Sequence, residues 1–168
     1  MDSKDVLLEA FGRVPARVHA VLDGVDEDTL ARRPPGGGNS VAWLVWHLTR
    51  VQDDHVSDVA GHEQTWTAQR WAQRFALPLA DEETGYGFDD DQVGLVRASA
   101  ELLAGYFDAV HDRTTGYLRT LSDADLDRVV DEDWDPPVTL GVRLVSVVDD
   151  DLEHAGQAAF LLGLLQRG

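Results

Sequence analysis

The 168-residue chain contains no cysteine. This absence excludes disulfide bonds, a protein thiol as nucleophile, and any zinc or iron–sulfur site that depends on cysteine ligands. A metal ion bound by this chain would need histidine and carboxylate ligands, and the sequence offers six histidines.

Basic side chains and long apolar runs are also scarce. The 14 Lys and Arg residues against 31 Asp and Glu residues give a formal net charge of −17. A chain this acidic is repelled by nucleic acids and anionic membranes, so we expect neither as a partner. The longest apolar runs, residues 41–46 and 158–162, are too short to span a bilayer. The N-terminus lacks the basic start and apolar stretch of a signal peptide, which predicts a soluble cytoplasmic protein.

What the sequence does contain is helical periodicity. Apolar residues recur at three- and four-residue steps in four segments, which are residues 6–22, 41–59, 93–121 and 140–165. We expect Pro15 to kink the first helix, Asn39 or Ser40 to cap the second, and Thr139 to cap the last. Acidic residues 89–91 suit the N-terminal end of the third helix. Strand-like alternation with hairpin turns is missing, so we expect no sheet.

Four amphipathic helices predict an all-α fold, a four-helix bundle that occupies residues 1–168 as a single domain. The connection over residues 61–88, partly helical, is long enough to run the length of the bundle. The second and third helices could therefore be parallel.

One stretch of the last helix is chemically unusual. Asp149, Asp150 and Asp151 lie in the middle of an apolar helix, where at least one of them must point toward the core. An unpaired buried carboxylate costs several kcal/mol, on the order found for buried ions, so a positive group should compensate it. Asp150 and His154 are four residues apart, on one helix face, and can chelate one ion.

His47 is the best candidate for a third ligand. It shares a stripe of the second helix with Leu44, Leu48 and Val51, so it should point inward. Three protein ligands with open positions are typical of catalytic metal sites, and this donor set suits zinc, nickel, iron or manganese. The ordinary alternatives are an exposed contact within one helix for the Asp-x-x-x-His pair and a structural role in the core for His47.

The neighbouring Asp54 and His55 are further candidates. His55 lies eight residues beyond His47, about 12 Å along a helix axis, which is too far to share the ion. It could contact a substrate, or be a half-exposed histidine beside two carboxylates. Trp134 could line a pocket mouth or be buried under its loop, and we interpret the carboxylates of residues 89–91 and 131–135 as solvated loop charges.

Two segments resemble the DinB-like superfamily. Residues 39–48 (NSVAWLVWHL) are similar to the second helix of that group, and residues 150–157 (DDLEHAGQ) are similar to its last helix. Residues 52–55 (QDDH) and 134–137 (WDPP) resemble the branch that contains the mycothiol-dependent maleylpyruvate isomerase and the mycothiol S-transferases.

The resemblance implies a DinB/YfiT-like four-helix bundle with a long crossover between parallel second and third helices. It implies a metal ion held by His47, Asp150 and His154. The position of Asp150 is occupied in the family by His, or by Glu in the isomerase, so this chain departs from the pattern there. Such bundles often form homodimers, and the apolar residues 160–165 could pair two copies.

The function that the resemblance implies is metal-dependent thiol transfer. A divalent metal, with zinc as the first choice, would hold the sulfur of a low-molecular-weight thiol such as mycothiol, which attacks an electrophilic small molecule. His55 and Asp54 are candidate catalytic residues. One alternative is a metallohydrolase in which Asp54 or Asp151 serves as general base toward a metal-activated water. Another is a non-enzymatic metal-binding stress protein.

Overall fold

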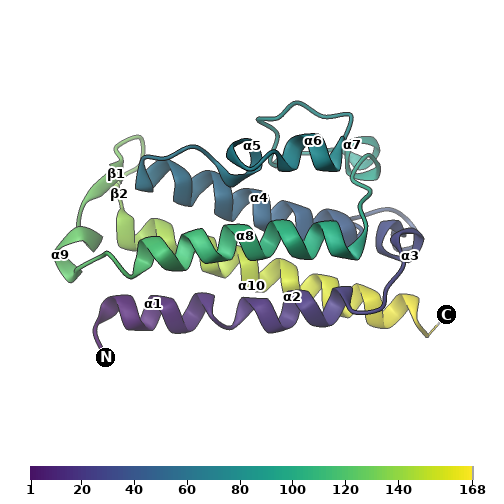
Figure 1. Ribbon diagram of the computed structural model, residues 1–168, viewed down its shortest axis with the longest axis horizontal. Coiled ribbons are helices and arrows are strands. Elements are labelled where there is room, and N and C mark those ends of the chain that lie inside the picture. Colours follow the sequence, from purple (N-terminus) through teal and green to yellow (C-terminus); the bar gives the residue numbers. More distant parts are fainter. Residues whose placement is uncertain (168) are drawn as a thin grey trace.

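In the described residues, long helices form four arms that pack side by side along the molecule (Figure 1). The computed structural model describes residues 1–167. The first arm is divided between α1 (Ser3–Phe11) and α2 (Val14–Leu22), and the others are α4 (Val41–Ala60), α8 (Ala100–Leu118) and α10 (Leu140–Leu165). Both α2 and α4 pack against α8 and α10. The predicted all-α bundle fold is confirmed.

The chain between α4 and α8 returns along the bundle (Figure 1). It contains α5 (Thr65–Ala68), α6 (Trp71–Phe75) and α7 (Asp90–Gly94). Because of this return, α8 begins at the same end of the bundle as α4, and the two helices run parallel. This is the direction that the long crossover predicted.

Side-chain caps define where the long helices begin. The hydroxyl of Ser40 accepts a hydrogen bond from the N–H of Trp43 at the start of α4, and Thr139 accepts one from Val142 at the start of α10. Both caps satisfy N–H groups that have no partner within the helix. Of the two predicted caps for the second helix, Ser40 is the correct one. Short helices α3 (Glu27–Ala31) and α9 (Asp123–Leu126) lie in the connections.

Three local predictions were wrong. The first arm breaks at residues 12–13, and Pro15 lies in the first turn of α2, where a missing N–H costs no helical hydrogen bond. The predicted third helix is two helices, since residues 95–99 leave the helical path between α7 and α8. A small antiparallel sheet is also present, formed by β1 (Val129–Asp131) and β2 (Val138–Thr139).

Helix α4 anchors the long connection through two buried charges. Arg50 has no exposed surface and donates to the backbone carbonyls of Asp81 and Glu83, each at 3.1 Å. Asp53 accepts three hydrogen bonds of 2.7–2.8 Å, from the backbone N–H groups of Thr65 and Trp66 and the hydroxyl of Tyr106. The Arg50 contacts hold the backbone at residues 81 and 83, next to the Thr84 carbonyl that contacts His47, and the Asp53 contacts hold the start of α5.

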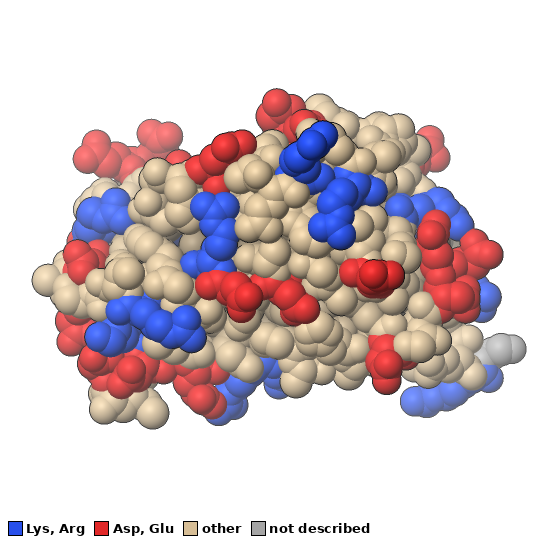
Figure 2. Space-filling model, viewed as in Figure 1, with Lys and Arg blue, Asp and Glu red and all other residues tan. Residues whose placement is uncertain are grey.

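The excess acidic charge lies on the surface. Figure 2 shows red carboxylate side chains from one end of the molecule to the other, with basic side chains between them. Across the described residues, no helix has the length and apolar character needed to cross a membrane.

Candidate metal centre

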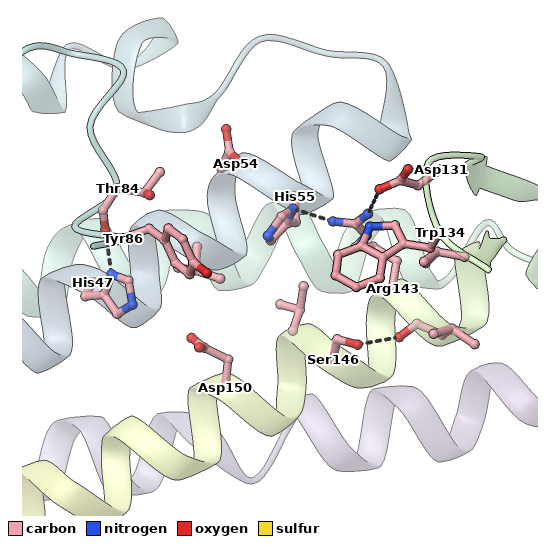
Figure 3. Close-up of a pocket in the computed structure, with 14 residues that line it drawn as sticks. His47, Asp54, His55, Thr84, Tyr86, Asp131, Trp134, Arg143, Ser146 and Asp150 are labelled. Atoms are coloured by element: carbon pink, nitrogen blue, oxygen red, sulfur yellow. Dashed lines mark hydrogen bonds and ion pairs between the residues drawn. The ribbon is translucent and has the colours of Figure 1, made fainter. Parts of the chain in front are cut away.

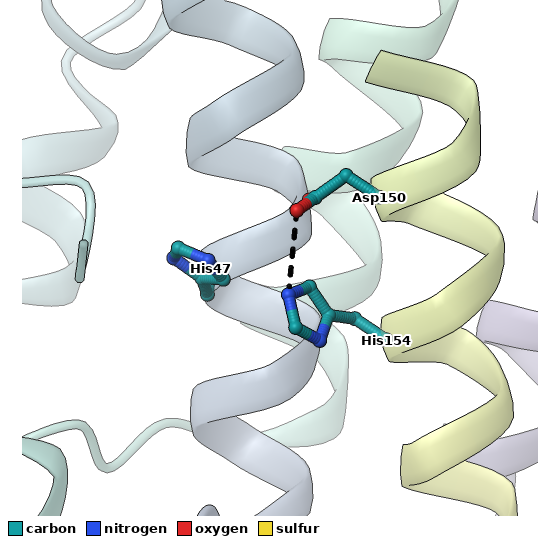
Figure 4. Close-up of side chains that lie close together, drawn as sticks. All are labelled: His47, Asp150 and His154. Carbon is teal, nitrogen blue, oxygen red and sulfur yellow. Dashed lines mark ion pairs between the residues drawn. The ribbon is translucent and has the colours of Figure 1, made fainter. Parts of the chain in front are cut away.

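Three side chains from two helices meet inside the bundle (Figure 4). His47 comes from α4, and Asp150 and His154 come from consecutive turns of α10. One ligand atom of each residue lies within 4.8 Å of those of the other two. The imidazole ring centroids of His47 and His154 are 5.0 Å apart. The structure therefore brings together the three residues that the sequence predicted as ligands.

The orientation of His47 is fixed by its surroundings. Its side chain is buried and stacks on Trp43, with 4.3 Å between ring centroids. Its Nδ1 lies 2.5 Å from the carbonyl oxygen of Thr84. A carbonyl can only accept, so Nδ1 carries the proton and Nε2 keeps its lone pair on the other side of the ring, which faces Asp150 (Figure 3). Burial lowers the pKa of His47, more than the Thr84 contact raises it, and favours the neutral ring that a metal requires.

His154 is oriented in the same way. Its Nδ1 lies 3.0 Å from the side-chain oxygen of Gln157, whose amide nitrogen donates to Glu153 at 3.0 Å. Nε2 therefore faces Asp150, with 3.4 Å to its Oδ1. Burial alone would lower the pKa of His154, but the contacts with Asp150 and Gln157 outweigh it and raise that pKa. A proton on His154 therefore places a positive charge beside Asp150.

Asp150 has one carboxylate oxygen left over. Its Oδ2 is buried and has no hydrogen-bond partner among the residues that the structure describes. A buried polar atom without a partner is costly unless a ligand completes it. Two imidazoles with outward-directed Nδ1 protons and one incompletely satisfied carboxylate form a donor set that fits a divalent metal ion.

A cleft of about 650 Å³ opens from this cluster (Figure 3). His47 and Asp150 lie at one end, and His55 and Arg143 lie at the other. Its walls are largely apolar and include the side chains of Val51, Val138, Val142, Val147, Tyr86 and Trp134. The candidate metal centre therefore faces a space of the size that binds small molecules.

The other predicted residues divide between cleft and core. Asp54 and His55 line the cleft, as does Trp134, which is 65% exposed, as expected for a residue at a pocket mouth. Asp151 is fully buried on another face of α10 and is not among the residues that line the cleft, so it is not placed to act as a base there. Burial raises the pKa of Asp151 well above its usual range. Asp131 was wrongly interpreted as a solvated charge, since it pairs with Arg143 at 2.8 Å in the cleft wall.

Several residues that complete the site were not identified from the sequence. Thr84 acts through its backbone carbonyl, which no residue pattern reveals. Gly85 has a φ of +93°, and a Cβ there would lie 2.9 Å from Nδ1 of His47, so this position requires glycine. Gln157 could have been found, because it lies three residues after His154 on the same helix. Arg143 could have been found from its spacing, seven residues and two turns before Asp150.

The fold and site define a class of protein, a helical bundle with a histidine–carboxylate cluster between two helices at the end of a cleft. The sequence model of the DinB superfamily matches residues 10–158, so this chain belongs to the DinB superfamily. A search of curated proteins found no match. Among solved structures, a conserved protein from Enterococcus faecalis is similar to this chain at 31% identity and a TM-score of 0.93, over 100% of this chain and 99% of that one.

Proposed function

We propose that the protein is a metal-dependent S-transferase that joins a low-molecular-weight thiol to an electrophilic small molecule. The observation that carries the proposal is the position of the His47–Asp150–His154 cluster at the end of an apolar cleft. A chain without cysteine must obtain its sulfur from a second molecule, and the cleft has room for one.

The ion itself would supply one piece of chemistry. A divalent metal held by His47, Asp150 and His154 would stabilise a thiolate at neutral pH, where a free thiol with a pKa of about 8.5 is mostly protonated. We propose zinc for this role, because two imidazoles and a carboxylate suit it, although the same ligands also accept nickel, iron or manganese.

The protein's own residues orient the reactants and exclude water. Thr84 and Gln157 hold the two histidines in the orientation that directs their Nε2 atoms at one point. The valine side chains of the cleft wall bury the apolar body of a substrate and keep water from competing with the thiol.

Mycothiol is the thiol that we propose. The support is the resemblance of residues 52–55 and 134–137 to the mycothiol-using branch of the superfamily, and both segments contribute cleft residues, Asp54 and His55 from the first and Trp134 from the second. The metallohydrolase alternative has one of its two proposed bases, Asp54, in the cleft, and the other, Asp151, in the core.

The test measures product formation from an electrophile with and without mycothiol, before and after metal removal by a chelator. We expect turnover to require both components and to return when zinc is restored. His154→Ala should abolish turnover, whereas His62→Ala, a change of a histidine outside the cluster, should not. Turnover that survives metal removal with every electrophile would contradict the proposal, and turnover without thiol would indicate a hydrolase.

A further inference from the structure

Helix α4 holds two cleft histidines in opposite tautomers. Nδ1 of His47 faces a carbonyl oxygen and therefore carries a proton. Nδ1 of His55 lies 3.0 Å from Nη1 of Arg143. A guanidinium is always protonated and can only donate, so Nδ1 of His55 must accept, and the neutral ring carries its proton on Nε2. His47 thus offers a lone pair to the cleft, and His55 offers an N–H.

Three structural elements maintain this state of His55. Arg143 on α10 donates to Nδ1 of His55 on α4 and, through Nη2, to Asp131 of β1 at 2.8 Å. The side chains of Arg143 and Asp131 are only 20% and 26% exposed, so this ion pair is shielded from solvent. Burial and the nearby positive charge of Arg143 lower the pKa of His55, which keeps the ring neutral.

The Nε2–H of His55 faces the cleft without a protein acceptor. Figure 3 shows the ring nitrogen that is not bonded to Arg143 on the side of Tyr86 and the middle of the cleft. None of the described residues accepts a hydrogen bond from it. The nearby carboxylates are already engaged, because Asp131 pairs with Arg143 and Asp54 accepts from the amide of Gln64 at 2.6 Å.

Charge decides which kind of acceptor fits this end of the cleft. Asp54 and Asp131 contribute two negative charges, Arg143 contributes one positive charge, and His55 is neutral. The resulting excess of negative charge disfavours a carboxylate or phosphate ligand. An uncharged carbonyl oxygen accepts the N–H without that repulsion.

We propose that the cleft binds a molecule whose uncharged carbonyl oxygen accepts the Nε2–H of His55 in the middle of the cleft. His55 is the group that contacts the ligand, and Arg143 is a positioning residue that fixes its tautomer. That this ligand is a reactant of thiol transfer rests on the proposed function. A carbonyl of the electrophile and an amide carbonyl of the thiol share this chemistry.

The first test is a binding measurement on the metal-free full chain, without any thiol. Acetophenone and ethylbenzene have nearly the same shape and differ by a carbonyl in place of a methylene. We expect acetophenone to bind about five- to tenfold more tightly, the effect of one hydrogen bond, and to shift the ¹⁵N resonance of His55 Nε2. The free protein should show the proton of His55 on Nε2. Equal affinities, a proton on Nδ1, or tighter binding of benzoate than of acetophenone would overturn the proposal.

Two variants of one residue separate the hydrogen bond from the shape of the side chain. His55→Phe keeps a ring but has no N–H, and it should remove the preference for acetophenone. His55→Gln retains an oxygen that can accept from Arg143 and an N–H that can donate to the ligand, and it should preserve most of that preference. Loss of the preference in both variants, or in neither, would contradict the role of the N–H.

Kinetics then identify the source of the carbonyl. If wild-type protein catalyses thiol transfer, His55→Phe should raise KM for only one of the two substrates, which is the one that carries the carbonyl, with the metal content unchanged. An equal effect on both substrates would refute the assignment. If transfer is not observed but acetophenone binds as described, the proposed function fails and the binding site stands.

Discussion

Gly85 is the position where adding a single methyl group should disturb the metal site. Its φ of +93° is strained for an L residue, and its close neighbours are the rings of His47, Trp46 and Trp43. A Cβ at this position would lie 2.9 Å from Nδ1 of His47 and 3.0–3.1 Å from the two indoles. Because all three rings are buried, the loop must retreat in Gly85→Ala, and the Thr84 carbonyl moves away from His47.

The size of the effect follows from two contributions. The unfavourable φ costs about 1–2 kcal/mol for any residue with a Cβ. The lost acceptor leaves the Nδ1–H of His47 buried without a partner, which costs about 1–3 kcal/mol more. Loss of a partner that orients a ligating histidine weakens metal binding about 10- to 100-fold.

Gly87 provides a matched control. It also has a positive φ, +73°, but a Cβ there meets nothing within 4 Å. Gly87→Ala should therefore lower the free energy of unfolding by the strain alone, about 1–2 kcal/mol, and leave metal affinity unchanged. Urea unfolding and competition with a chelator measure the two quantities. If Gly85→Ala binds zinc as tightly as the wild type, or if Gly87→Ala loses as much affinity, the assigned role of Thr84 is wrong.

Three further changes test other parts of the structure. Gln157→Leu should weaken metal binding about 10- to 100-fold in a chelator competition, because His154 loses the acceptor for its Nδ1, whereas Gln157→Glu keeps that acceptor and should restore binding. Asp53→Ala should lower the free energy of unfolding by about 3–5 kcal/mol in a urea titration, because the buried Arg50 loses its counter-charge. The control Asp58→Ala, on the exposed side of α4, should change it by less than about 0.5 kcal/mol. Burial lowers the pKa of His111, so below about pH 6.5 the unfolded chain takes up a proton more readily than the folded one and stability falls as the pH decreases. The free energy of unfolding of His111→Phe, taken relative to wild type, should therefore be higher at pH 5 than at pH 8. The same relative value at both pH values would refute this assignment.

The sequence predicted the long helices because their apolar periodicity and caps are local properties. Ser40 and Thr139 begin α4 and α10 as expected. The breaks were harder to locate, since Pro15 suits a helix start as well as a kink. The two short strands were missed because their pairing joins residues 129–131 to residues 138–139 over a few hydrogen bonds, without an alternating pattern.

The candidate ligands were predictable for a similar reason. Asp150 and His154 share a helix face, and His47 lies on the inward stripe of α4. The structure adds the contacts that orient them, which depend on a backbone carbonyl at residue 84 and on the packing of the long connection against α4. Such contacts join segments that are far apart in the chain, and their geometry cannot be derived from residue spacing.

Pairing of two copies stays a prediction. Phe160 is 70% exposed and Leu164 is 49% exposed, while Leu161 and Leu162 are buried in the bundle. Sedimentation of the full chain would measure the oligomeric state.

The measurement that tests the central claim most directly is the metal content of the purified chain and of ligand variants. The structure predicts one divalent ion per chain in the wild type, and loss of that ion in His47→Ala, His154→Ala and Asp150→Asn, with helical content retained by circular dichroism. Unchanged metal stoichiometry in folded samples of these variants would show that His47, Asp150 and His154 do not hold the metal.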